Sequence, residues 1–254
     1  MHAKSKDWPE AVEVINETGR SDIVLLCEHA SNHMPLEYQN LGLEAKHLER
    51  HIAWDIGAAE VTRRLSKCLD APAFLGTYSR LLIDLNRPLD SASSIPVRSE
   101  DTDIPGNVEI DASEKAKRAA AIFKPFHESV AACLDRRKLE RRATRIVTIH
   151  SFTPVFMGRV RPWHAGVLYA QAGELGEAVI TGLRADKDLN VEANVPYVIS
   201  RDADYAVPFH GDDRGIPAVL IEIRQDLLAD ASGTEEWAGR LATALPALET
   251  ETSR

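Results

Sequence analysis

The sequence predicts an α/β fold with one domain over residues 1–254. Short apolar runs alternate with longer helical patterns, which is typical of α/β proteins. The run Ile23–Cys27 is apolar at every position, as expected of a strand buried on both faces of a sheet. The chain has 254 residues, of which 44% are hydrophobic and 27% are charged. This ordinary globular composition excludes a disordered or fibrous protein, and no segment resembles a linker.

The strands are expected where short apolar runs occur. In chain order these runs are Ile23–Cys27, Ala73–Gly76, Leu81–Leu85, Ile146–Ile149, Gly166–Ala170, Pro196–Ile199 and Ala218–Ile223. The helices are expected in the longer segments, which are Pro9–Asn16, Ile56–Cys68, Ser113–Arg142, Glu174–Ala185 and Thr234–Leu245.

The predicted helix Ser113–Arg142 carries one apolar stripe, since its apolar residues recur at steps of four. These residues are Ile122, Phe126, Val130 and Leu134. Pro125 lies within the stripe and is expected to bend the helix, because proline lacks a backbone donor. The segment Pro88–Asp111 is rich in Ser, Asp, Pro and Gly, which predicts a long loop without regular structure. Loops of this length are usually functional lids or disordered segments, so a lid that closes over the site is one hypothesis for it.

Charge and cysteine content narrow the function classes. Lys and Arg number 30 and Asp and Glu 39, so the formal net charge is −9, which argues against nucleic acid as a partner. The three cysteines are far apart in sequence and form no CxxC, which argues against a disulfide framework and favours a cytoplasmic location. We find no signal-peptide core and no apolar run of membrane-spanning length, so no membrane partner is expected. The oligomeric state stays open.

Two predicted strands are followed by histidines that could bind a metal. His29 follows Ile23–Cys27 and His150 follows Ile146–Ile149. Parallel neighbouring strands would bring both to one edge of the sheet, where α/β proteins bind ligands. A catalytic zinc ion needs about three protein ligands. His29 could instead be a hydrogen-bonded loop residue.

The third metal ligand is left open among three residues. The candidates are Asp55, Glu28 and Asn32, and Asn32 ranks last because an amide oxygen is a poor zinc ligand beside a carboxylate. Asp55 could alternatively cap a helix that begins at Ile56.

Glu222, near the end of the strongly apolar run Ala218–Ile223, is a candidate general base for a metal-bound water. Its alternatives are a surface position or an ion pair with Arg224. Cys27 is expected to be a small core residue rather than a nucleophile.

Candidate substrate-binding residues surround the run Leu81–Leu85. Arg80 and Arg87 flank this run, with Asn86 beside the second arginine. A guanidinium group binds a carboxylate through two hydrogen bonds, so these residues indicate an acidic substrate. The alternative is structural pairing of the arginines with Asp84 or Asp90.

Two further histidines could serve the site. His127 lies on the predicted helix Ser113–Arg142, and His210 lies in a loop before the last predicted strand. Either could hydrogen-bond substrate or a transition-state oxyanion, and either could be structural. His33, His47 and His51 are assigned no role.

Together these segments resemble the N-formylglutamate amidohydrolase family. The most specific segment is the run YSRLLIDLNRP, residues 78–88, and further matches lie at the segments around His29, Asp55, His127, His150, His210 and Glu222. The family is similar in turn to zinc carboxypeptidases and aspartoacylases. This wider resemblance implies a mixed, largely parallel central sheet flanked by helices, one zinc ion and a glutamate base. It also implies an Asn-Arg pair that receives the substrate carboxylate.

Carried over by this resemblance, the zinc ligands are His29 and His150, the base is Glu222, and the carboxylate receptor is Asn86 with Arg87. The carboxypeptidase pattern has a zinc-binding Glu three residues after the first His, where this chain has Asn32. Asp55 is our substitute for that ligand.

The resemblance predicts a zinc-dependent amidohydrolase of the kind found in histidine degradation. Its expected substrate is a small anionic acyl-amino acid such as N-formyl-L-glutamate, cleaved to formate and glutamate. Arg80 or His210 would help the zinc to stabilise the oxyanion. The alternatives are a peptidase or another deacylase on the same site, or a non-catalytic binder of acidic ligands.

Overall fold

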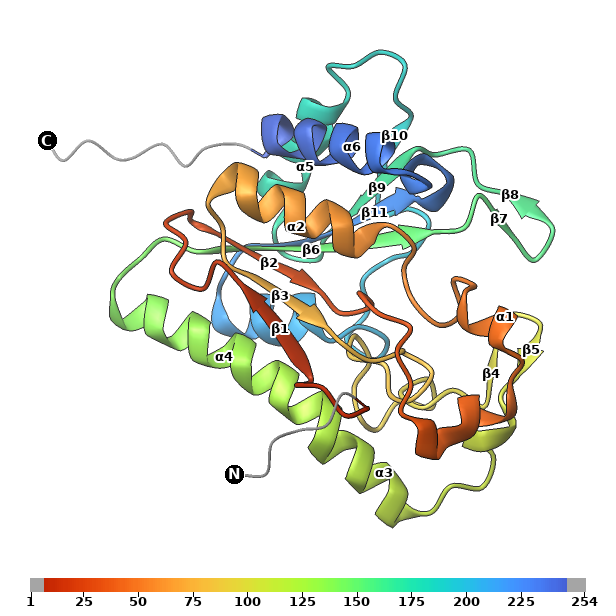
Figure 1. The fold of residues 1–254 in the computed structure, drawn as a ribbon. Coiled ribbons are helices and arrows are strands. Elements are labelled where there is room, and N and C mark those ends of the chain that lie inside the picture. The colour runs from red at the N-terminus through yellow and green to blue at the C-terminus, as the bar shows by residue number, and fades with distance from the viewer. Residues whose placement is uncertain (1–6, 246–254) are drawn as a thin grey trace, which may run out of the picture.

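A seven-stranded sheet forms the centre of the computed structural model, which describes residues 7–245 (Figure 1). The strand order is β1-β3-β2-β6-β11-β9-β10. The strands are β1 (Val12–Ile15), β2 (Ile23–Cys27), β3 (Ala73–Gly76), β6 (Arg145–Phe152), β9 (Ala165–Leu168), β10 (Val191–Ala193) and β11 (Ala218–Arg224). The pairs β1–β3 and β9–β11 are antiparallel and the other four pairs are parallel. The predicted mixed, largely parallel sheet is confirmed.

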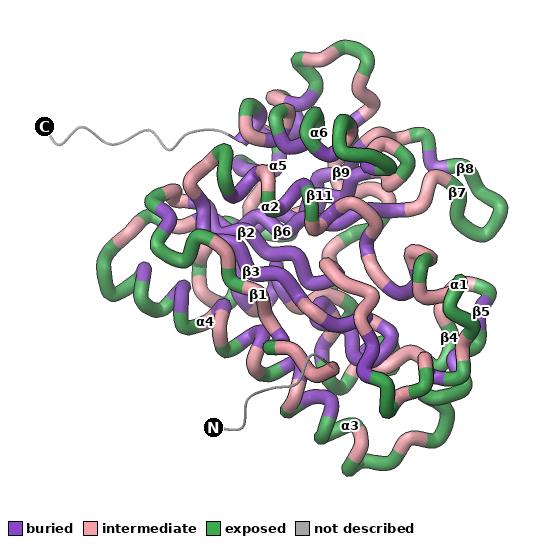
Figure 2. Tube along the Cα trace, viewed as in Figure 1, coloured by how far each residue is buried: buried purple, intermediate pink, exposed green. Residues whose placement is uncertain are grey.

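Helices cover both faces of this sheet (Figure 1). On one face lie α2 (Ala58–Leu69), α5 (Gly173–Leu183) and α6 (Ala231–Ala244). On the other lies α4 (Lys124–Leu139), which α3 (Ala112–Arg118) precedes. The buried strand β2 sends alternate side chains into the two hydrophobic cores, as the period of two in a strand requires. Figure 2 shows the central strands as the buried layer between exposed helix surfaces.

Smaller elements lie beyond the carboxyl ends of the central strands (Figure 1). One group contains the short helix α1 (Ala45–Leu48) and the two-stranded hairpin β4 (Arg98–Ser99) with β5 (Thr102–Asp103). A second hairpin, β7 (Val155–Phe156) with β8 (Arg159–Val160), projects from the end of β6. No helix within residues 7–245 combines the length and the apolar character that crossing a membrane requires.

Three predicted elements are wrong. The segment Pro9–Asn16 contains the edge strand β1 instead of a helix, because three of that strand's four residues are β-branched and pair with β3. Leu81–Leu85 is apolar because it is buried, yet its backbone forms turns, with Asp84 bonded to Ser94 O at 2.7 Å. Pro196–Ile199 is a partly exposed loop, and the strand of this region is β10.

The long predicted helix over residues 113–142 is interrupted by a π-helical turn at Ala119–Phe123. Pro125 lies in the first turn of α4, directly after this turn, where a missing backbone N–H is tolerated. The apolar stripe that the spacing predicted is confirmed, since all four of its side chains are buried in the core beneath α4.

The predicted loop Pro88–Asp111 has more order than expected, because it contains the hairpin β4–β5 and a short 3-10 turn at Pro105–Asn107. Asn107 is buried and fixes this segment, donating to Leu81 O and Pro96 O at 2.8 Å each. The polar composition of the segment Pro88–Asp111 therefore reflects internal hydrogen bonds as well as solvent exposure. A lid role for this loop stays a prediction.

Candidate functional site

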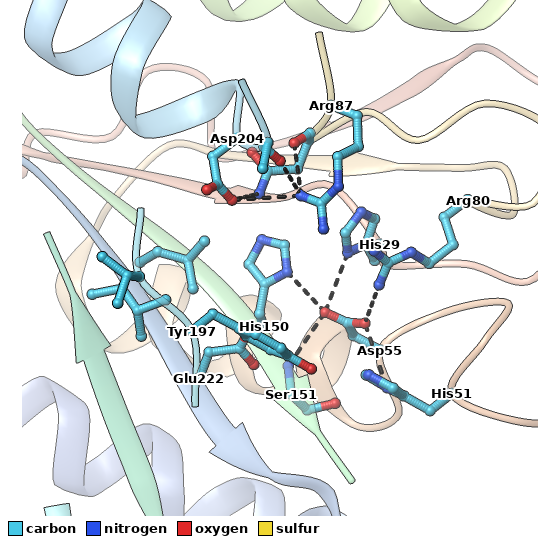
Figure 3. Close-up of a pocket in the computed structure, with 15 residues that line it drawn as sticks. His29, His51, Asp55, Arg80, Arg87, His150, Ser151, Tyr197, Asp204 and Glu222 are labelled. Atoms are coloured by element: carbon cyan, nitrogen blue, oxygen red, sulfur yellow. Dashed lines mark hydrogen bonds and ion pairs between the residues drawn. The ribbon is translucent and has the colours of Figure 1, made fainter. Parts of the chain in front are cut away.

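A cavity of about 300 Å³ opens where the carboxyl ends of β2, β6 and β11 meet (Figure 3). His29 follows β2 by two residues, and His150 lies within β6, which extends to Phe152. Glu222 stands opposite His150 in the parallel register of β6 and β11. The sheet therefore brings together the side chains that the sequence placed at one edge, and all three line the cavity.

Two histidines and one carboxylate form a cluster that can hold a metal ion. The Nδ1 atom of His150 lies 2.8 Å from Asp55 Oδ2, and the Nδ1 atom of His29 lies 3.3 Å from the same oxygen. All three residues are buried, and their candidate ligand atoms lie within 4.8 Å of one another. Three is the number of protein ligands in a metal site that keeps one position open for water.

The outer ring nitrogens of both histidines face carboxylates. His29 Nε2 lies 2.7 Å from Asp84 Oδ1, and His150 Nε2 lies 2.9 Å from Glu28 Oε2. Burial raises the pKa of Glu28, but hydrogen bonds from His150 and Thr148 outweigh it and bring that pKa to about 2. Burial also raises the pKa of Asp84, but Arg80, His29 and Arg87 together outweigh burial and hold that pKa well below its usual value.

Ionised Asp84 and Glu28 only accept hydrogen bonds, so both Nε2 atoms must donate. When such a histidine is neutral, its proton is on Nε2, and its Nδ1 directs a lone pair at Asp55. The Asp55 oxygen also carries lone pairs, so these atoms can act together as metal ligands. Burial opposes protonation of His150, but hydrogen bonds to Asp55 and Glu28 raise its pKa well above the usual value, so Nδ1 can also carry a proton toward Asp55. A metal ion at the centre would take the place of that proton. Carboxylates that hold the outer nitrogen in this way are usual around metal-binding histidines. The donor set therefore fits a metal ion.

The position of Asp55 separates it from the other candidate ligands. Asn32 instead donates to Leu48 O at 2.9 Å, and Glu28 faces the outer nitrogen of His150. The helix-cap alternative for Asp55 is wrong, because α2 begins at Ala58 behind Gly57. Asp55 also accepts from the backbone of Ser151 at 3.3 Å, which fixes its carboxylate toward the cavity.

Gly57 allows the chain to turn from Asp55 into α2. Its φ is +81°, and a Cβ atom would lie 2.3 Å from Leu228 Cβ. We expect Gly57→Ala to lower the free energy of unfolding by about 1–3 kcal/mol, since a left-handed conformation and a clash act together. The measurement is chemical denaturation. Gly239→Ala is the control: it lies exposed in α6 with nothing within 4 Å of the added Cβ, and should stabilise slightly.

Glu222 is buried in the cavity wall with an unpaired oxygen. Its Oε2 atom has no hydrogen-bond partner among the described residues. Burial, together with the charge of Asp55, raises the pKa of Glu222 to about 7 despite His150. The alternative ion pair with Arg224 is wrong, because Arg224 binds Asp226 at 2.8 Å. The structure thus holds a carboxyl group that can exchange a proton near neutral pH.

Arg80 lines the cavity but is engaged by carboxylates of the chain. Its Nε and Nη2 atoms contact Asp84 Oδ2 at 3.0 and 2.8 Å, and its Nη1 atom lies 3.4 Å from Asp55 Oδ1. The structural pairing with Asp84 that the sequence left open is therefore present. Arg80 thus links Asp55, one of the three candidate metal ligands, to Asp84, which holds His29.

Asn86 and Arg87 also line the cavity. The amide oxygen of Asn86 accepts from the backbone of Tyr205 and Ala206 at 3.0 Å each. Arg87 Nη1 donates to Ala203 O and Asn86 O. The Nε and Nη2 atoms of Arg87 have no partner within residues 7–245, and the guanidinium group points into the cavity (Figure 3).

His127 and His210 lie outside the cavity lining. The Nδ1 atom of His127 lies 2.9 Å from His210 Nε2, and its Nε2 atom lies 2.9 Å from Leu85 O. Since a carbonyl oxygen only accepts, His127 donates through Nε2 and accepts from His210. Burial lowers the pKa of His127 to about 3 and that of His210 to about 4, so the pair is neutral. The structure shows them supporting the backbone next to Asn86.

The cavity lining also includes residues to which the sequence had assigned no role, among them His51, Tyr197 and Asp204. His51 is partly buried, with Nδ1 3.6 Å from Asp55 Oδ1, and its spacing of four residues from Asp55 could have suggested it. Tyr197 and Asp204 come from the loop after β10. Tyr197 accepts from Arg161 at 2.9 Å, a contact between distant segments that no local pattern reveals.

Comparisons with known proteins agree with this fold and identify the family. A model of the family described as N-formylglutamate amidohydrolase matches residues 21–229. A crystal structure of a gene product from Agrobacterium tumefaciens is similar at 38% identity, with a TM-score of 0.91 and 95% and 96% of the two chains covered. The structure of an N-formylglutamate amidohydrolase from Ralstonia eutropha shares the fold at 14% identity, with a TM-score of 0.70 and coverage of 93% and 96%. Among curated protein sequences, none matches this chain.

Proposed function

The chain belongs to the N-formylglutamate amidohydrolase family, and from this premise we propose that it is a zinc-dependent amidohydrolase of N-acyl amino acids. The reference substrate is N-formyl-L-glutamate, which would be cleaved to formate and glutamate. The observation that carries the proposal is the convergence of His29, His150 and Asp55, with both outer ring nitrogens held by carboxylates. Zinc is the ion that this His₂-carboxylate set suits best.

The proposed residues divide into holders of the ion and groups that act on substrate. His29, Asp55 and His150 would hold a zinc ion, which when bound polarises a carbonyl and makes water more acidic. Glu222 would take a proton from the attacking water and pass it to the leaving amine. Its unpaired oxygen and its pKa of about 7 suit both transfers.

The substrate would be oriented by the arginine side of the cavity. Arg87 has unpaired donors that point inward and would hold a carboxylate of N-formyl-L-glutamate, or a carboxamide in the same place, assisted by the amide nitrogen of Asn86. Arg80 would face the carbonyl oxygen as negative charge develops there. We propose that His127 and His210 act on the reaction only through the backbone that precedes Asn86.

Metal content and activity should change together if the proposal is right. We expect about one zinc ion per chain by elemental analysis, because one cluster of three ligands is present in the described part of the chain. Removal by a chelator should abolish hydrolysis of N-formyl-L-glutamate, and added zinc should restore it. A metal-free preparation with full activity would exclude the mechanism. Stoichiometric metal without hydrolysis of any acyl-amino acid would favour a non-catalytic binder.

A second candidate is a deacylase or peptidase that accepts larger acyl groups. A groove of about 250 Å³ adjoins the cavity and shares His51, Arg80, Arg87 and Tyr197 with it. Phe156 from the hairpin β7–β8 also lines this groove. Comparing formyl, acetyl and succinyl derivatives of one amino acid, together with short peptides, separates this candidate from a deformylase.

A further inference from the structure

Asp204 is an acidic residue in the part of the cavity where a substrate carboxylate would bind. Its carboxylate is mostly buried and lies beside the proposed carboxylate receptor (Figure 3). One oxygen, Oδ1, lies 3.3 Å from Asn86 Nδ2 and 3.5 Å from Arg87 Nη1. The other, Oδ2, accepts from the backbone of Ser200 at 2.9 Å. A carboxylate of the chain therefore already faces the two groups that would receive one from the substrate.

The backbone holds Asp204 in this position. The residues that follow it, Tyr205 and Ala206, both donate their backbone N–H groups to Asn86 Oδ1 at 3.0 Å. The residue before it, Ala203, accepts from Arg87. Asp204 thus belongs to the same hydrogen-bonded unit as the receptor.

Apart from the proposed metal ion, the cavity lining offers little positive charge to a substrate carboxylate. The charge of Arg80 is matched by Asp84 and Asp55, which contact all three nitrogens of its guanidinium group. Arg87 is the remaining guanidinium group of the cavity lining, and Asp204 lies beside it. The contact is longer than the 2.7–2.9 Å of a strong charged hydrogen bond, so Arg87 keeps donors for a ligand. An anionic ligand there would stand close to Asp204 in a partly buried site, where like charges repel strongly.

A neutral carboxamide suits this arrangement better than a carboxylate. Its oxygen can accept from Arg87, while its N–H can donate to Asp204. A carboxylate can make only the first of these interactions.

We propose that Asp204 is a specificity-determining residue, which disfavours substrates that present a carboxylate to Asn86 and Arg87 and favours those that present a carboxamide. This inference rests on the proposed function, because it takes the substrate to be an N-acyl amino acid. It predicts that kcat/KM is higher for an analogue of N-formyl-L-glutamate in which one of the two carboxyl groups is an amide.

The test compares three zinc-loaded proteins on three substrates. The proteins are the wild type, Asp204→Asn and the control Asp202→Asn, which removes the same charge from an exposed position in the same loop. The asparagine at position 204 keeps an oxygen for the Ser200 N–H and has nearly the same volume. The substrates are N-formyl-L-glutamate, N-formyl-L-glutamine and N-formyl-L-isoglutamine.

For each protein we form the ratio of kcat/KM for N-formyl-L-glutamate to kcat/KM for an amide. We expect this ratio to be about tenfold higher in Asp204→Asn than in the wild type for one of the two amides, which corresponds to about 1.4 kcal/mol. The amide that shows the change identifies the carboxyl group that faces Asp204. Asp202→Asn should leave the ratios unchanged. Unchanged ratios in Asp204→Asn, or an equal loss on all three substrates, would overturn the proposal. The equal loss would mean that Asp204 only orients Arg87.

Calorimetric binding of glutamate, glutamine and isoglutamine to the same proteins gives a readout that needs no turnover. In Asp204→Asn the affinity for glutamate is expected to rise relative to the affinity for one of the two amides. An unchanged ratio, or no binding of any of the three compounds, counts against the proposal. If the wild type hydrolyses none of the three formyl compounds, the proposed function fails. The binding ratios still decide the role of Asp204.

Discussion

The variant Glu222→Gln is expected to lose between about 10²-fold and 10⁴-fold in kcat on N-formyl-L-glutamate, which is the range that general acid–base catalysis supplies. Glutamine has nearly the same shape but cannot accept a proton from water. Because Glu222 is not one of the three clustered ligands, zinc content should stay at about one ion per chain. Steady-state kinetics and elemental analysis of the same preparation check both parts.

The control for this variant is Glu192→Gln, the same chemical change at an exposed position on strand β10 of the same sheet. Its kcat should match that of the wild type. Undiminished turnover in Glu222→Gln would remove Glu222 from the mechanism. A loss of zinc in that variant would mean that Glu222 binds the ion instead.

The variant Asp55→Asn is expected to lower zinc affinity by more than 100-fold and activity with it. Replacing a residue that only orients a ligand typically costs 10–100-fold in affinity, and Asp55 is itself placed among the ligand atoms. Asparagine keeps an oxygen for the Ser151 N–H but loses the charge that balances the ion. Competition with a chromogenic chelator measures the affinity.

Asn32→Ala serves as the comparison, because Asn32 stands at the place where the carboxypeptidase pattern has its ligand. Its side chain bonds Leu48 O in this structure, so zinc affinity should change little. Reduced affinity in Asn32→Ala together with normal affinity in Asp55→Asn would reverse the assignment of the third ligand.

The central strands could be predicted from sequence because their burial leaves a local trace. The run Ile23–Cys27 is apolar throughout and is fully buried as β2. Leu81–Leu85 carries a similar trace and is equally buried, but turns replace the strand. Apolar character therefore predicted burial correctly at both places. A strand also needs a neighbouring strand to pair with, and the apolar pattern does not show whether one is available.

The site could be predicted where strands deliver the side chains. His29, His150 and Glu222 converge because parallel strands end together, a rule that can be applied without coordinates. Asp204 and Tyr197 could not be predicted, since the loop that carries them follows no periodic pattern. Their positions depend on contacts with Arg87 and Arg161, which are distant in sequence.

The parallel register of β6 and β11 places Glu222 beside His150 through backbone hydrogen bonds at the centre of the sheet. A shift by one residue would turn Glu222 to the opposite face, so this pairing tolerates no insertion within either strand. Asp204 and Tyr197, in contrast, sit in a surface loop where changes in length and sequence are tolerated. Under these proposals, the residue for proton transfer lies in the sheet, and the residue that adjusts the substrate preference lies in this loop. A designer could therefore exchange the loop to alter the substrate and leave the reacting groups in place.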